Sequence, residues 1–262
     1  MSPSPDPVAP NLVAMATGEP RIGLMCTLNS GYALEVAAGA GFDWMLIDTE
    51  HSPADLDDVL RQLQVLAGYP TAPVVRVPWN DFVTIKRYLD VGARSLLVPF
   101  VETAEQARQA VAATRYPPDG IRGVALATRA SGFGRVPHYA RRAHEGLVVI
   151  CQIENQVGLE NLESIAAVEG VDALLVGPSD LHASFGLVGE TSDPKVIEVI
   201  DDAIRRIVAT GKAAGVFAPV EELAHRWIDL GARLVLVGSD VGILVRGSDA
   251  LMRAYRSPRV DG

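Results

Sequence analysis

The 262-residue chain carries a formal net charge of −9 and no run of basic residues. Its length suits one large α/β domain or barrel with a substantial core. Because nothing in it would attract a phosphate backbone or an anionic membrane, we expect neither nucleic acid nor a membrane surface as a partner.

Residues 1–18 begin with the stretch MSPSPDPVAPNL, which has four prolines and no positive charge. It lacks the basic and apolar parts of a secretory signal, so we expect a flexible tail ahead of one domain over residues 19–262. No apolar run approaches the roughly 20 residues of a membrane helix, which indicates a soluble protein. Cys26 and Cys151 each lie in an apolar run, which favours buried reduced thiols and a cytoplasmic location.

After the tail, short apolar runs alternate with longer amphipathic ones, a pattern typical of a parallel sheet connected by helices. The eight apolar runs cover residues 22–28, 44–48, 72–77, 95–100, 147–154, 173–180, 213–219 and 233–240. Between them, stretches such as 53–68, 81–92 and 194–211 have apolar residues three or four apart and end in glycine. The pattern predicts a (β/α)8 barrel. The longer Gly- and Pro-rich connection at 115–145 indicates a functional loop or lid.

Polar residues gather at the ends of the predicted strands, where such a barrel carries its chemistry. They are Asp48, Glu50 and His51 at the end of the second strand, Arg76 at the end of the third, Gln152 and Glu154 at the end of the fifth, and Asp180 after the sixth. Because these ends meet at one mouth, the side chains are expected to face one another. The other four histidines, left without a role, are His138, His144, His182 and His225.

Glu154 and Asp180 are the candidate metal ligands, since neighbouring strands lie about 4.8 Å apart and carboxylates at their ends can meet on one ion. Oxygen ligands favour a hard divalent cation, Mg²⁺ or Mn²⁺, with Co²⁺ and Zn²⁺ as further options. The alternative is that both acids cap the following helices. The turn at 177–180 offers backbone amides to a substrate carboxylate, although ordinary loop geometry explains it equally well.

Arg76 and His51 are the candidate catalytic side chains. Arg76 is a permanent cation with planar donors, suited to an oxyanion that develops on a carbonyl; its alternative role is a salt bridge to Asp48. His51 can accept a proton near neutral pH, and a nearby carboxylate favours its protonated form. A structural role is the alternative for the histidine.

Six stretches, in order, resemble the HpcH/HpaI aldolase family of metal-dependent pyruvate aldolases. They are GFDWMLIDTEHSP, PVVRVPWND, LDVGARSLLVPFVETAEQA, RYPPDGIRG, QIEN and VDALLVGPSDL. The resemblance implies a (β/α)8 barrel whose last helix packs on a neighbouring subunit, in a homohexamer. It also implies reversible cleavage of 4-hydroxy-2-oxoacids to an aldehyde and pyruvate, or hydroxypyruvate, through a metal-stabilised enolate.

The resemblance also implies roles for individual residues. His51 is the base, Arg76 stabilises the enolate and alkoxide, Glu154 and Asp180 bind the metal, and Gln152 with the Ser179 and Asp180 backbone holds pyruvate. Asp90, in the stretch YLDVG, would raise the basicity of His51 within the subunit or across its boundary. Asp48 would support the histidine locally, and Glu50 would lie behind these groups.

Two departures from the family pattern concern the aldehyde side of the site. Met25 stands where some relatives carry tryptophan, and His182 follows GPSDL where serine is common. Met25 and Phe217 are expected to line the aldehyde pocket, because both lie at the mouth and neither has a polar group for binding or catalysis. The alternative is that they only pack the top of the barrel.

Other functions are compatible with the same barrel. A citrate-lyase-like enzyme acting on acyl-CoA should offer basic residues to the nucleotide phosphates, and the strand-end loops are poor in them. A barrel that binds a small acid without turning it over would not need a base, a cation and metal ligands together. An imine mechanism is not expected, because Lys86, Lys195 and Lys212 all lie away from the carboxyl ends of the strands.

Overall fold

The computed structural model describes residue 12 and residues 18–256, which form a closed barrel of eight parallel strands in sequence order. The predicted (β/α)8 fold is therefore confirmed. The strands are β1 (Arg21–Cys26), β2 (Trp44–Asp48), β3 (Ala72–Arg76), β4 (Ser95–Val98), β5 (Val148–Ile153), β6 (Ala173–Val176), β7 (Ala213–Phe217) and β8 (Ala232–Ser239). Apart from β2, each strand ends earlier than its apolar run, because the last residues of the run already belong to the connection at the mouth.

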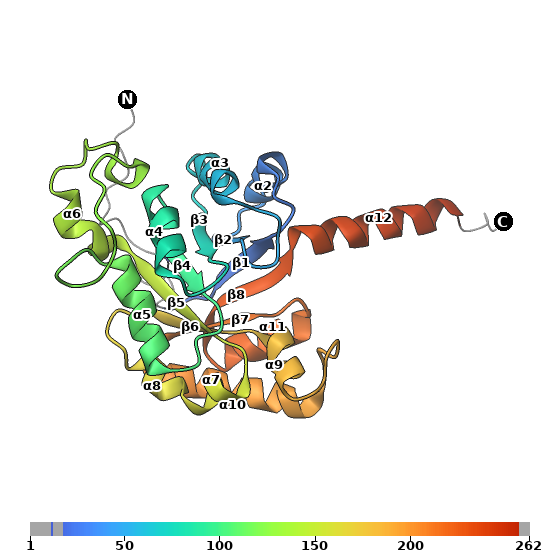
Figure 1. Ribbon diagram of the computed structural model, residues 1–262. Helices are drawn as coiled ribbons and strands as arrows, with labels where there is room; N and C mark the ends of the chain where they lie inside the picture. The colour runs from blue at the N-terminus through green and yellow to red at the C-terminus, as the bar shows by residue number, and fades with distance from the viewer. Residues whose placement is uncertain (1–11, 13–17, 257–262) are drawn as a thin grey trace, which may run out of the picture.

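Helices follow the strands and surround the barrel (Figure 1). They are α2 (Gly31–Ala38), α3 (Leu56–Leu66), α4 (Phe82–Asp90), α5 (Ala104–Thr114), α6 (Tyr139–Arg142), α7 (Gln156–Glu160), α8 (Leu162–Ala166), α9 (Pro178–Ser184), α10 (Pro194–Ala209), α11 (Glu221–Asp229) and α12 (Asp240–Arg256), with 3-10 turns η1 (Arg129–Ser131) and η2 (Ala143–Gly146). Several start at a polar cap. In α3 the Asp55 carboxylate accepts hydrogen bonds from the Asp57 and Asp58 amides, so the helix begins at a defined residue.

Side chains alternate between two apolar layers along each strand. In β2, Trp44 and Leu46 point into the barrel, whereas Met45 and Ile47 pack outward under the helices. Gly23 on the neighbouring strand makes room for the indole, because a Cβ there would lie 2.4 Å from the Trp44 ring. Burial of each such side chain contributes about 1.5–3 kcal/mol, and the inner layer fills the barrel below the mouth.

Two segments show features that their sequences did not indicate. Leu12 falls in the segment expected to be a flexible tail, yet its side chain is buried against the inner layer of the barrel; residues 1–11 and 13–17 lie outside the described residues. Residues 115–145 were expected to form a functional loop or lid. They join the end of α5 to the start of β5, at the barrel end opposite the mouth, and contribute no residue to the mouth cavity of their own chain.

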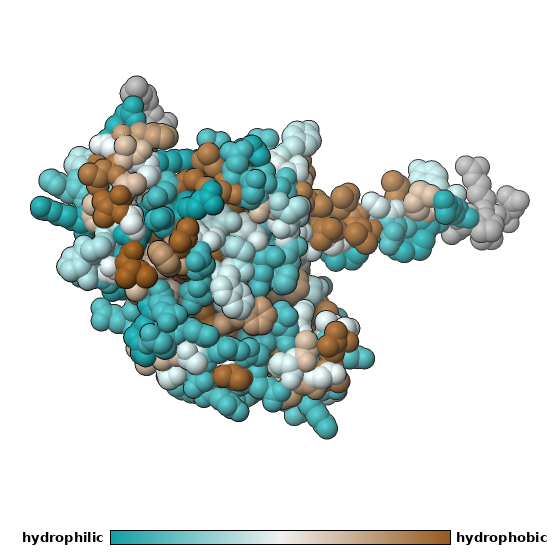
Figure 2. All heavy atoms as spheres, in the orientation of Figure 1, coloured by the Kyte–Doolittle hydropathy of each residue, from teal (hydrophilic) through white to brown (hydrophobic). Residues whose placement is uncertain are grey.

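The last helix, α12, projects away from the barrel instead of packing along it (Figure 1). None of its residues is buried. Its exposed large apolar side chains are Val241, Ile243, Leu244, Val245, Leu251, Met252 and Tyr255. Figure 2 shows apolar surface on the part of α12 nearest the barrel. Within the described residues, no helix is long and apolar enough to cross a bilayer.

Candidate active site

The inner face of the barrel changes from apolar to polar at the carboxyl ends of its strands. Leu46 and Asp48 take successive inward positions on β2, and Ile150 and Gln152 do so on β5. The polar residues are thus the next inward layer above a packed apolar floor. The strand periodicity of two is what places them there.

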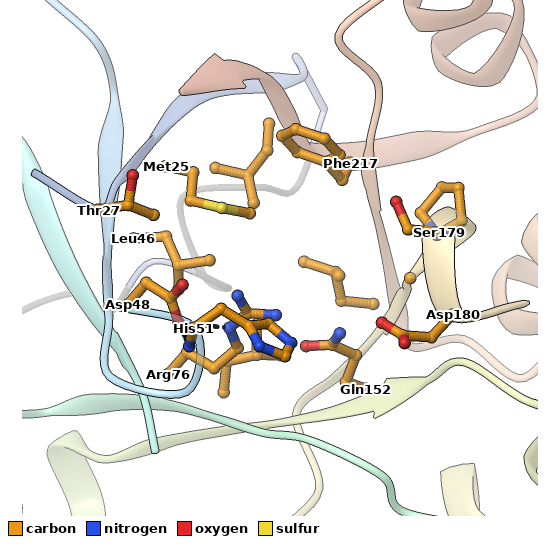
Figure 3. A pocket seen from close by; sticks show the side chains of 15 residues that line it. Met25, Thr27, Leu46, Asp48, His51, Arg76, Gln152, Ser179, Asp180 and Phe217 are labelled. Atoms are coloured by element: carbon orange, nitrogen blue, oxygen red, sulfur yellow. Dashed lines mark hydrogen bonds and ion pairs between the residues drawn. The ribbon is translucent and has the colours of Figure 1, made fainter. Parts of the chain in front are cut away.

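A cavity of about 370 Å³ opens above this floor. Its lining consists of Met25, Thr27, Leu46, Asp48, His51, Arg76, Leu97, Gln152, Leu175, Gly177, Pro178, Ser179, Asp180, Phe217 and Leu236. In Figure 3, Met25 and Phe217 lie on one side, and His51, Gln152 and Asp180 lie on the other. The cavity therefore has an apolar half and a polar half, and it brings together most of the residues that the sequence singled out.

Arg76 is held by two buried acids. Its Nε donates to Asp48 Oδ1 at 2.8 Å, and its Nη1 lies 3.0 Å from Glu50 Oε2. The salt bridge to Asp48 therefore forms, and Arg76 still lines the cavity. Burial raises the pKa of Glu50, while the charge of Arg76 opposes that rise. Glu50 is more central than the sequence suggested, because together with Asp48 it fixes the plane of the guanidinium.

His51 is exposed at the cavity edge, with 60% of its side chain accessible. Its Nε2 lies 3.8 Å from Glu50 Oε2. Asp48 Oδ1 instead accepts the backbone amide of Glu50 at 3.0 Å, and that of His51 at 3.5 Å. The Asp48 side chain thus supports His51 by accepting a hydrogen bond from its backbone amide. Glu50 is the carboxylate that lies beside the imidazole ring.

Glu154 directly follows β5 and is buried; it does not line the cavity itself, and both of its oxygens accept hydrogen bonds. Oε1 accepts the Phe100 amide at 2.7 Å, and Oε2 accepts a hydrogen bond from Gln152 Nε2. Burial raises the pKa of Glu154 to about 7, and the charges of Glu50 and Asp180 add to the rise. The three carboxylates therefore lie near enough for their charges to affect one another.

The first turn of α9 closes this side of the cavity. Glycine at position 177 leaves room for Glu154, because a Cβ there would lie 2.9 Å from Glu154 Oε2. Gly177 is the N-cap residue of α9 and has no side chain to accept a hydrogen bond. The backbone amides of the first turn of α9 are therefore not capped by a side chain. Asp180 lies in this first turn of α9, after the end of β6, as the sequence predicted. His182 points elsewhere: it is fully buried, and its Nδ1 lies 2.7 Å from the Pro178 carbonyl.

Other polar candidates lie away from the cavity. Asp90 ends α4 at the opposite end of the barrel, where it pairs with Arg122 Nη2 at 2.7 Å. It therefore does not reach His51 of its own chain. None of the three lysines lines the cavity. Lys212 donates to the Val171 carbonyl, and Lys195 is exposed in the first turn of α10.

The fold and the site define a (β/α)8-barrel enzyme with a carboxylate-rich mouth for a small polar substrate. The profile of the HpcH/HpaI aldolase/citrate lyase family matches residues 21–247, and the chain belongs to this family. It is 52% identical to a pyruvate aldolase of Rhizobium etli, over 92% of this chain and 95% of that protein.

Two further comparisons agree with the family. The chain is 50% identical to a 4-hydroxy-2-oxo-heptane-1,7-dioate aldolase of Salmonella heidelberg, over 92% of both chains. A crystal structure of an HpcH/HpaI aldolase/citrate lyase family protein from Burkholderia cenocepacia has a TM-score of 0.87 and 41% identity, and the match covers 91% of this chain and 95% of that one.

Proposed function

We infer that this protein is a class II pyruvate aldolase, which reversibly cleaves 4-hydroxy-2-oxoacids to pyruvate and an aldehyde. One observation supports the inference most strongly. Arg76 forms ion pairs with Asp48 and Glu50 at the mouth of the barrel, where Glu154 and Asp180 also lie. This arrangement provides both a fixed cation for a developing oxyanion and carboxylates for a metal. Two relatives about half identical to this chain are named as aldolases.

Glu154 and Asp180 would hold a divalent cation, and we propose Mg²⁺ or Mn²⁺, with Co²⁺ or Zn²⁺ able to substitute. The residues fit such an ion, because Asp180 lines the cavity and the buried Glu154 carboxylate lies near enough for the charge of Asp180 to act on it. When bound, the ion would stabilise negative charge on the keto oxygen of the substrate. No described group of three or more His, Cys, Asp and Glu residues forms a larger ligand set, so water and substrate would supply the remaining ligands.

The chain's own groups would orient the 2-oxoacid. The amides of Ser179 and Asp180 at the start of α9 suit the carboxylate. Gln152 Oε1 is buried and has no hydrogen-bond partner among the described residues, so it is available to accept a hydrogen bond from a hydroxyl group of the substrate. Arg76, held in one plane, would donate to the oxygen on which charge develops.

His51 would move the proton. In cleavage it accepts the proton of the C4 hydroxyl, the C3–C4 bond breaks, and its electron pair forms the enolate of pyruvate as the aldehyde leaves. In synthesis the new C–C bond forms and His51 returns the proton to the alkoxide. The exposed position of the ring at the cavity edge suits exchange of this proton with solvent.

We propose that the aldehyde occupies the apolar half of the cavity, between Met25 and Phe217. Phe217 ends β7 at the mouth, and Met25 lies near the end of β1. Both side chains are apolar, so they suit contact with the carbon chain of an aldehyde. Hydroxypyruvate is a second donor to be tested beside pyruvate.

We further propose a homohexamer in which α12 packs on a neighbouring subunit. The exposed apolar side chains of this projecting helix support that arrangement, because a helix of this kind needs a partner surface. Asp90 is remote from the cavity of its own chain, so any support it gives to His51 would come from a neighbouring subunit. The buried free thiols Cys26 and Cys151 are compatible with a reducing compartment.

The direct test is pyruvate release from a 4-hydroxy-2-oxoacid, measured with lactate dehydrogenase and NADH. Release should require a divalent cation, stop on addition of a chelator and resume with Mn²⁺ or Mg²⁺. Cleavage of an acyl-CoA substrate without any release of pyruvate would assign the protein to the citrate-lyase-like activity instead.

A further inference from the structure

Phe100 has an unusual backbone for an aromatic residue. It follows β4 and has a φ of 50°, in the left-handed region. A non-glycine residue pays roughly 1–2 kcal/mol there, because its Cβ crowds the backbone. Such strain persists only where surrounding contacts impose it, and it concentrates at functional sites.

The left-handed turn directs two successive amides toward β5. In extended backbone, neighbouring N–H groups point in opposite directions, so two of them cannot face one strand. Here the Phe100 amide donates to Glu154 Oε1 at 2.7 Å, and the Val101 amide donates to the Gln152 carbonyl at 3.3 Å. The connection after β4 is thus bound to β5 beside both polar residues of the site.

The aromatic ring resists relaxation of this turn. The Phe100 and Trp79 ring centroids lie 5.8 Å apart, and Trp79 follows Arg76 by only three residues. The contact between the two rings therefore connects the segment after β3, which contains Trp79, to the segment after β4, whose Phe100 amide binds Glu154. Since Gln152 Nε2 occupies Oε2, the carboxylate is fixed at both oxygens before any cation enters.

We propose that Phe100 is a positioning residue, whose left-handed backbone aims its amide at Glu154 and orients that carboxylate for the divalent cation. The proposal rests on the metal site of the proposed function. Each carboxylate oxygen retains a lone pair for the ion, so the amide and the cation do not compete. A carboxylate held in advance loses less freedom when the metal binds.

The test compares three variants by Mn²⁺ titration, with free Mn²⁺ followed by electron paramagnetic resonance. Phe100→Val retains an amide but disfavours a positive φ, so it should weaken Mn²⁺ binding about tenfold, the effect of one lost charge-assisted hydrogen bond. Phe100→Gly accepts the turn and should bind within about threefold of wild type. Phe133→Val is the matched control, because Phe133 also has a positive φ, 58°, but lies away from the cavity. It should bind Mn²⁺ like wild type.

A second measurement needs no metal. In chelator, Phe100→Val should lower the Tm more in the wild-type background than in a Glu154→Ala background, where the acceptor is absent. This non-additivity tests the contact between Phe100 and Glu154 even if the wild-type protein binds no Mn²⁺. Absence of Mn²⁺ binding by the wild-type protein would instead refute the proposed metal site. Additive Tm changes, wild-type Mn²⁺ affinity in Phe100→Val, or equal weakening in Phe100→Gly and Phe100→Val would overturn the proposal.

Discussion

Glu154→Gln should stabilise the metal-free protein above neutral pH. Burial, with the charges of Glu50 and Asp180, raises the pKa of Glu154 from 4.5 to about 7. As pH rises from 4.5 to 7, the unfolded chain loses this proton while the folded protein keeps it, so folding stability falls. The loss is about 3 kcal/mol, absent below pH 4.5 and complete above pH 7.

Glutamine removes this loss because it carries no charge to desolvate. Its carbonyl can still accept the Phe100 amide, and Gln152 can rotate its carboxamide to accept the new NH₂ group. Thermal unfolding in chelator should give nearly equal Tm values at pH 5 and a Tm about 6–12 °C higher for the variant at pH 8, the shift expected for about 3 kcal/mol in a domain of this size. Mn²⁺ at pH 8 should stabilise wild type and leave the variant almost unchanged. A variant no more stable than wild type at pH 8 in chelator would refute this account of Glu154.

The remaining predictions concern catalysis. His51→Ala should lower retro-aldol kcat at least about 100-fold and leave Mn²⁺ affinity intact, because the base is not a ligand; a matching loss of Mn²⁺ affinity would contradict this. Arg76→Lys should also lose most activity, since an ammonium cannot reproduce the planar contacts with Asp48 and Glu50; near-normal turnover would make Arg76 structural. Phe217→Ala should change relative kcat/KM among aldehydes more than it changes pyruvate proton exchange, and parallel changes would exclude contact with the aldehyde. Borohydride with pyruvate should leave the protein mass unchanged, and a trapped lysine adduct would reverse the mechanism.

The barrel and the core of its site follow from periodicity. Alternating runs predicted the strands, and a period of two along β2 places Asp48 in the inward row of Leu46. Arg76 faces Asp48 because the two are register partners on β2 and β3. These features depend on local sequence and on a topology with few alternatives, so a single sequence is enough to predict them.

Other features depend on contacts that sequence spacing does not show. The pairing of Glu50 with Arg76 arises from the turn after β2, and the left-handed turn at Phe100 carries no glycine to signal it. Leu12 packs against the inner layer of the barrel although its proline-rich segment was expected to be a flexible tail. Asp90 pairs with Arg122, which lies 32 residues further along the chain. The resemblance to the family gave no sign of this pairing within one chain, so it did not predict where Asp90 lies.

The most direct test of the central claim is exchange of the pyruvate methyl protons with deuterium, followed by NMR. If the protein forms the enolate of pyruvate at a metal site, exchange should proceed without any aldehyde, stop in chelator and return with Mn²⁺ or Mg²⁺. Arg76→Lys should reduce it strongly. Exchange at the full rate after exhaustive chelation, or no exchange with any of these ions, would contradict a metal-dependent pyruvate aldolase.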